Sequence, residues 1–207
     1  MALMRTGGGL SIRCLLLTSA VILLAVIPSQ ASVMRFLSVE ELADKSSQVV
    51  RAKIMRQTTY WTANHEGIYT EIDALVIGDL KSAGAPGPRA GERHLTIIQA
   101  GGVIDGVSLD WTGRPKFNDG EDLVLFLAPY ERTDLQDQRL LVVGGKQGRM
   151  RVVRDAKGNP MVERDLAGVL DAPFIEGDEP KGPAPRRDLM TFDELRNKIH
   201  AGRGGVR

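Results

Sequence analysis

Alternating apolar and polar residues run through the middle of the chain and predict a fold rich in β-strands. Residues 48–57 alternate with a period of two, and residues 68–77 do so with many β-branched side chains. This is the period of strands that bury one face. Shorter apolar or alternating runs predict further strands at residues 94–99, 123–127, 140–143, 149–154 and 161–163.

The block from Gly101 to Leu127 is expected to contain the central strand of the fold. Its end, residues 123–127, is wholly apolar and is typical of a strand covered on both faces. Before it lies Asp119-Gly120, a dipeptide that readily takes the positive φ values of a tight turn. We therefore expect the chain to reverse there and to enter a central strand.

Two helices are predicted near the ends of the chain. Ser38 and Glu41 form a capping-box pattern ahead of a short helix over residues 39–45. Thr191 and Glu194 repeat the pattern after a Pro-rich linker at residues 172–187. The tail, residues 188–207, could dock on the rest of the protein or be marginal alone. Its few apolar residues predict that deleting residues 181–207 leaves the unfolding transition largely intact.

These elements predict a mainly β domain over residues 32–171. Strands at short spacing with helices only at the ends favour an all-β or β-rich class. A small closed antiparallel barrel is the preferred architecture, because closure removes the exposed edge strands.

The first 31 residues have the pattern of a secretory signal peptide. Arg5 and Arg13 supply a positive start, residues 14–27 are largely apolar, and Ser29 and Ala31 give a small-x-small ending. The alternative is an uncleaved membrane anchor, but the apolar run is shorter than the ~20 residues of a spanning helix. We expect a secreted or periplasmic protein that begins at Ser32, with no stable membrane anchor after cleavage.

Composition narrows the chemistry of the mature chain. The single cysteine, Cys14, lies in the signal segment, so thiol catalysis, cysteine zinc sites and disulfides are excluded. Removing the two signal arginines changes the net charge from +1 to −1. This balance argues against a nucleic-acid partner.

Ionisable residues form no recognisable catalytic or metal-binding motif. His65-Glu66 begins like a zinc-protease motif, but Tyr69 stands where the second histidine is needed, and His94 and His200 are expected at the surface. The central block carries several acids without the spacing of a calcium loop, and we interpret them as turn-forming or solvated carboxylates: Asp105, Asp110, Asp119, Glu121 and Asp122. We predict no catalytic residues, no metal site and no cofactor.

Four aromatic residues are the candidate binding residues: Tyr60, Trp61, Tyr69 and Trp111. Aromatic side chains at the loop ends of a small barrel can form a binding face, because interfaces favour Trp and Tyr. The alternative is that these rings plug the ends of the barrel. Both interpretations stay open on the sequence alone.

Spaced glycines and aromatics between residues 38 and 153 resemble a family of uncharacterised exported bacterial proteins. The matching segments are residues 48–53, 67–70, 79–81, 101–102, 117–121, 125–127 and Gly148. That family is similar in strand pattern to five-stranded oligonucleotide/oligosaccharide-binding (OB) barrels, which netrin modules and tissue inhibitors of metalloproteinases also use. The resemblance implies an OB-like barrel and carries over no catalytic residue. The inhibitors begin with a zinc-chelating cysteine, whereas this mature chain should begin Ser32-Val33-Met34.

These features together favour an exported, non-enzymatic protein-binding module. Its expected partner is another exported protein, and a protease is one candidate. The resemblance suggests an alternative, an inhibitor of a secreted metalloprotease, which the missing cysteine weakens. A hydrolase that uses acids of the central block comes third.

Overall fold

The computed structural model of the chain describes residues 34–82, 93–131, 139–167, 169–170 and 187–202. The predicted signal peptide and the Pro-rich segment up to residue 186 lie outside these residues. Within the described part of the chain, no helix has the length and apolar character needed to span a bilayer.

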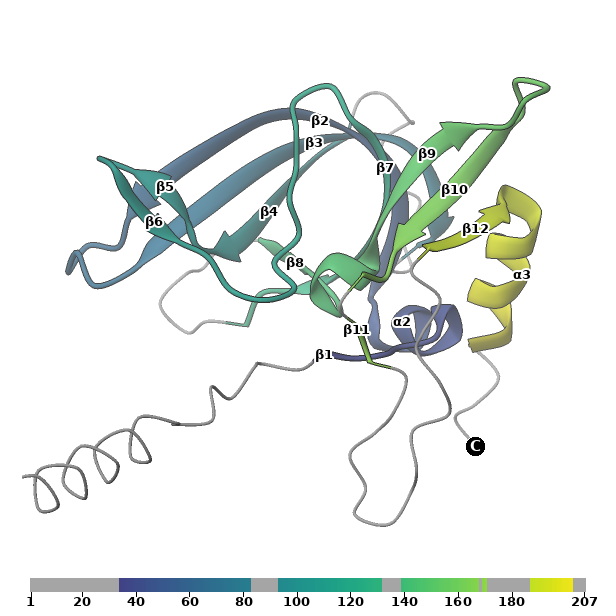
Figure 1. The fold of residues 1–207 in the computed structure, drawn as a ribbon, viewed down its shortest axis with the longest axis horizontal. Helices are drawn as coiled ribbons and strands as arrows, with labels where there is room; N and C mark the ends of the chain where they lie inside the picture. Colours follow the sequence, from purple (N-terminus) through teal and green to yellow (C-terminus); the bar gives the residue numbers. More distant parts are fainter. Residues whose placement is uncertain (1–33, 83–92, 132–138, 168, 171–186, 203–207) are drawn as a thin grey trace, which may run out of the picture. The chain divides into compact units, whose positions relative to one another are not determined.

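Five strands close into a barrel, which confirms the predicted mainly β class (Figure 1). Around the barrel they follow in the order β7 (Asp122–Pro129), β2 (Gln48–Trp61), β3 (Ile68–Lys81), β4 (His94–Ala100) and β8 (Leu140–Val142). Strand β8 pairs back on β7 and closes the ring. Every neighbouring pair is antiparallel except for one parallel contact, Ile97 with Leu140, between β4 and β8.

Strands β2 and β3 form a long hairpin that extends past the core. On β3 the alternation predicted from the sequence is seen directly, because Ile68, Thr70 and each second residue through Val76 are buried. Strand β2 is longer than predicted and continues from residue 58 to Trp61, paired with residues 68–71 of β3. Its register shifts at three places, and such bulges bend and coil a strand.

Strand β7 is the centre of the fold, as its apolar run predicts. Residues 123–127 are completely buried, and the strand pairs with β2, β8 and β9 (Arg149–Arg154). Leu123, Leu125 and Leu127 face the barrel interior, whereas Val124 and Phe126 belong to a second apolar cluster that includes both helices. The predicted turn at Asp119-Gly120 lies just before the strand, and Gly120 has a φ of 84°.

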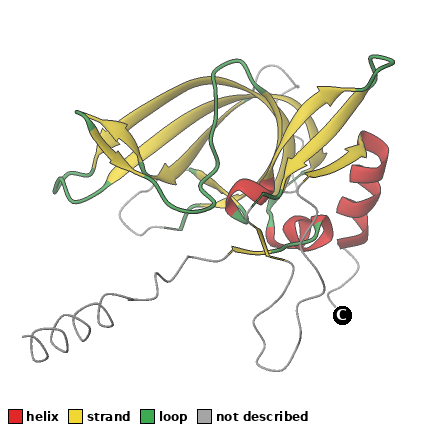
Figure 2. Cartoon of the chain, in the orientation of Figure 1, coloured by secondary structure: helices red, strands yellow, loops and turns green. Residues whose placement is uncertain are grey.

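Beyond β7 the sheet continues outside the barrel through β9, β10 (Pro160–Asp165) and β12 (Arg187–Thr191). Two helices, α2 (Val39–Lys45) and α3 (Phe192–Gly202), lie near this extension (Figure 2). Both capping boxes are present: Ser38 exchanges hydrogen bonds with Glu41, and Thr191 does so with Glu194.

The C-terminal segment belongs to the core, which corrects the prediction that it adds little. Leu195 and Ile199 of α3 are completely buried, and Met190 of β12 is nearly so. All three pack in the same cluster as Phe126 of β7 and Leu42 of α2. The narrow apolar stripe read from the sequence is thus the buried face of a docked helix.

Short elements complete the fold. The 3-10 helix η1 (Gly145–Gly148) joins β8 to β9, and β1 (Met34–Arg35) pairs in parallel with β11 (Val169–Leu170). A separate hairpin joins β5 (Gly102–Ile104) to β6 (Val107–Leu109) through Asp105-Gly106, both at positive φ. The sequence analysis missed this hairpin, although an Asp-Gly pair between apolar residues is a strong hairpin signal.

Candidate functional site

Three of the four predicted binding residues meet at one end of the β2–β3 hairpin. Tyr60 and Tyr69 are cross-strand partners, and their stacked rings have centroids 6.4 Å apart. Trp61 follows at the end of β2, where its ring centroid lies 5.9 Å from that of His65. Its indole Nε1 donates a hydrogen bond of 3.0 Å to the Asp105 carboxylate at the β5–β6 turn. That bond holds the ring on the edge of the site.

Two residues that the sequence analysis did not select complete this site. The Tyr130 hydroxyl donates to the Tyr69 hydroxyl at 3.4 Å, and Arg139 Nη1 donates to the Tyr60 hydroxyl at 3.0 Å. Arg139 also lies 3.6 Å from the Glu71 carboxylate. A groove of about 720 Å³, here called the aromatic groove, is lined by residues of the β2–β3 turn and by five further side chains: Tyr60, Trp61, Tyr69, Tyr130 and Arg139. Its polar groups include the hydroxyls of the three tyrosines, the Arg139 guanidinium and the side chains of Thr62, Asn64 and Glu66.

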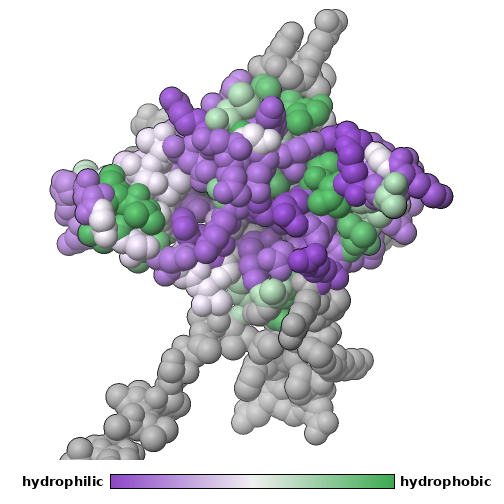
Figure 3. Space-filling view, turned by 45° about the horizontal axis from the view of Figure 1, so that its top comes forward, coloured by the Kyte–Doolittle hydropathy of each residue, from purple (hydrophilic) through white to green (hydrophobic). Residues whose placement is uncertain are grey.

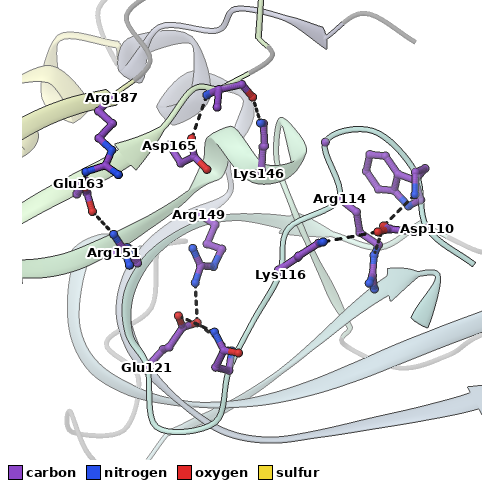
Figure 4. Close-up of a pocket in the computed structure, with 14 residues that line it drawn as sticks. Asp110, Arg114, Lys116, Glu121, Lys146, Arg149, Arg151, Glu163, Asp165 and Arg187 are labelled. Atoms are coloured by element: carbon purple, nitrogen blue, oxygen red, sulfur yellow. Dashed lines mark hydrogen bonds and ion pairs between the residues drawn. The ribbon is translucent and has the colours of Figure 1, made fainter. Parts of the chain in front are cut away.

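The fourth predicted residue, Trp111, lies in a different place. Its indole Nε1 donates to the backbone oxygen of Ala100 at 3.2 Å, and 46% of the residue is exposed. It lines a second groove of about 800 Å³, here called the charged groove (Figure 4). The four aromatics therefore do not form one face. Tyr60, Trp61 and Tyr69 are half-buried and Trp111 is exposed.

Ion pairs dominate the charged groove. The loop between β6 and β7 contributes Asp110, which pairs with Arg114 at 2.8 Å and lies 3.8 Å from Lys116. Strand β9 contributes Arg149, which donates to the Glu121 carboxylate at 2.6 Å. The remaining charged residues that line it are Lys146, Arg151, Glu163, Asp165 and Arg187. In the space-filling view, hydrophilic residues cover most of the middle of the visible face, and apolar patches lie at its left end, at its top and on its right (Figure 3).

Two carboxylates of this groove are held in the ionised form. The hydrogen bond from Arg114 lowers the pKa of Asp110, against an opposing effect of burial. Burial raises the pKa of Glu121, but hydrogen bonds from Arg149 and Asn118 outweigh it, so the net shift is downward. A general acid at neutral pH needs a raised pKa, so neither group is suited to that role.

The acids of the central block are dispersed. Asp105 accepts from Trp61, Asp119 is 3.4 Å from Gln57, and Asp122 pairs with Arg51 at 2.5 Å. Within the described ranges, no three His, Cys, Asp or Glu side chains gather as a metal site would require. His94 and His200 are exposed, as predicted.

Comparison with known proteins gives no family or relative on which to build. No protein-family model matches the sequence, and no curated protein matches it. The resemblance to exported bacterial proteins therefore stays a prediction from the motifs, and the function has to be argued from the two grooves.

Proposed function

We propose that this protein is an exported, non-enzymatic module that binds another exported protein through the aromatic groove. The observation that carries the proposal is the convergence of Tyr60, Trp61, Tyr69, Tyr130 and Arg139 on one groove. Tyr, Trp and Arg are the residues that dominate the binding energy of protein interfaces. Cross-strand stacking and hydroxyl hydrogen bonds hold the rings in place, so little side-chain entropy is lost on binding.

The barrel topology supports an OB-like assignment and this location of the site. OB barrels have five strands in a partly open Greek-key arrangement, and they bind ligands near the loops that join strands 1–2 and 4–5. Here β2, β3, β4, β7 and β8 occupy the five positions in chain order. Trp61 lies at the first loop position, and Tyr130 and Arg139 flank the second.

The non-enzymatic part of the proposal is supported by the state of the ionisable groups. Asp110 and Glu121 have lowered pKa values and are engaged by arginines. Catalytic acids and bases need pKa values near the working pH, which burial or like charges produce. Export is supported by the signal-peptide pattern in the first 31 residues.

The test compares two tryptophan variants in capture of partners from the exported fraction of the source organism. Trp61→Ala should weaken the captured complex by about tenfold or more, because interface hot spots are worth about 2 kcal/mol each. Trp111→Ala is the matched control, since it removes a half-exposed tryptophan from the other groove. Equal capture by wild type and Trp61→Ala would show that the aromatic groove is not the binding site.

The alternative, inhibition of a secreted metalloprotease, is decided by a second assay on the captured partner. Loss of its proteolysis at a one-to-one ratio would establish inhibition. Binding without a change in proteolysis would favour the simple module. The absence of a cysteine after the predicted cleavage site argues for the second result.

A further inference from the structure

We propose that the charged groove is a second binding site, specific for an acidic oligosaccharide, meaning a sugar chain that carries carboxylate groups. The site is separate from the aromatic groove, and among the residues that the structure describes the two share no lining residue. The argument rests on three features of its lining: an excess of positive charge, carboxylates placed among the cations, and an exposed tryptophan.

Positive charge exceeds negative charge among the described residues of the groove. Six Lys or Arg side chains line it against four Asp or Glu side chains. Two carboxylates each form ion pairs with two cations. Asp110 pairs with Arg114 and Lys116, and Glu163 pairs with Arg151 and Arg187. One carboxylate neutralises one of the two charges in each group, so each group keeps a charge that can attract an anion.

The outer cation of each group is the more accessible one. Lys116 and Arg187 are each 76% exposed, and they lie 3.8 Å and 3.3 Å from the carboxylate that they share. Figure 4 shows the two groups on opposite sides of the groove, with Lys146 and Arg149 between them. An elongated ligand that lies along the groove could therefore place acid groups near both.

The carboxylates favour a sugar over other polyanions. Glu163 and Asp165 add negative charge that would repel a nucleic acid or an acidic peptide with closely spaced charges. A sugar chain carries many hydroxyl groups, which can donate hydrogen bonds to these carboxylates while its acid groups accept from Lys and Arg. The mixed lining suits a ligand with both kinds of group.

Trp111 supplies a flat apolar surface within this polar groove. The residue is 46% exposed, and its Nε1 donates a hydrogen bond to the backbone oxygen of Ala100, which restrains the orientation of the ring. An exposed and restrained indole face costs little entropy to use as a stacking surface for the C–H face of a sugar ring. Asn118 also lines the groove; its amide nitrogen donates to Glu121, and its amide oxygen is a possible acceptor for a sugar hydroxyl.

The experiment is isothermal titration of the mature chain with hexagalacturonate at low and at physiological ionic strength. Binding should be measurable and should weaken with salt, because the outer cations are exposed and screened. The double variant Lys116→Ala/Arg187→Ala should bind at least about tenfold more weakly, and Trp111→Ala should show a similar loss. Both cations are largely exposed, and circular dichroism checks that the variants fold.

A charge-matched control is Lys53→Ala/Lys157→Ala, which removes two exposed lysines outside the groove and should change affinity less than about twofold. Trp61→Ala should leave sugar binding unchanged, so that failure of this site and failure of the aromatic groove are distinguishable. No binding of hexagalacturonate, or full binding by the Lys116/Arg187 double variant, would overturn the proposal. So would equally tight binding of a neutral galactose hexamer or of hexaglutamate, the latter indicating an acidic peptide instead.

Discussion

At the scale of single residues, Glu121 connects the turn at Asp119-Gly120 to the central strand. Its carboxylate accepts hydrogen bonds from the Asn118 backbone N–H at 2.9 Å, from the Asn118 amide at 3.0 Å and from Arg149 at 2.6 Å. We expect Glu121→Gln to lower the free energy of unfolding at pH 7 by about 1–2 kcal/mol, since it removes the charge from these bonds. Urea unfolding measures the change.

The stability difference between wild type and Glu121→Gln should also depend on pH. The net effect of its hydrogen bonds is a pKa below the usual 4.5 for Glu121, so the folded state favours the ionised form. That stabilisation is complete above pH 4.5 and is lost as the pH falls through the lower folded value. The difference between wild type and Glu121→Gln should therefore shrink below about pH 4.5. Asp44→Asn, at an exposed position on α2, is the control, and a pH-independent difference for Glu121→Gln would contradict the assignment.

At the scale of elements, α3 is predicted to stabilise the whole domain. Leu195 and Ile199 are completely buried in the second apolar cluster, which they share with Phe126 of β7. Either Leu195→Ala or Ile199→Ala should cost about 2–4 kcal/mol, through lost burial and the cavity left behind. Asn197→Ala, on the exposed face of the same helix, should change stability by less than about 0.5 kcal/mol. Thermal unfolding of the three variants compares them, and a wild-type midpoint for Ile199→Ala would show that α3 is dispensable.

Elements with a strong pattern of their own could be predicted, and elements stabilised by partners could not. Strand β3 alternates over its whole buried length, and β7 is wholly apolar, so both were visible in the sequence. Strand β12 reads Arg-Asp-Leu-Met-Thr, which carries little strand signal, and it forms through pairing with β10. The contribution of α3 to the stability of the fold was underestimated, because a short apolar stripe in the sequence does not show how deeply its residues are buried.

The candidate site was predictable only where its residues are close in the chain. Tyr60 and Tyr69 meet because they face each other across one hairpin, which local pattern can indicate. Tyr130 and Arg139, which flank the connection from β7 to β8, reach them only when β8 pairs with β4 and β7 and closes the barrel. Trp111 was grouped with the others as an aromatic residue expected at a loop end of the barrel, and the loop between β6 and β7 places it in the charged groove instead.

At the scale of the whole molecule, the residues that follow the predicted cleavage site are built into the fold. Gln147 accepts from the Leu37 N–H at 2.9 Å and donates to the Arg35 oxygen at 2.7 Å. Arg164, completely buried on β10, donates to the Leu37 oxygen and to Gln147. Burial lowers the pKa of Arg164 to about 10, despite the nearby charges of Asp188, Glu40 and Glu41. The guanidinium is thus still charged at neutral pH and depends on these acceptors.

This arrangement predicts that the position of the mature N-terminus matters for stability. With export and cleavage after Ala31, as we propose, N-terminal sequencing should read Ser32-Val33-Met34. A chain that begins there keeps the hydrogen bonds of Arg35 and Leu37 to Gln147 and Arg164. A chain that begins at Ser38 would leave the buried guanidinium without the Leu37 oxygen and should lose about 2–4 kcal/mol of unfolding free energy. Denaturant unfolding of the chains 32–207 and 38–207 tests this directly. Equal midpoints would mean that the N-terminal segment does not stabilise the fold, and a mature start at Met1 would refute export with cleavage after Ala31.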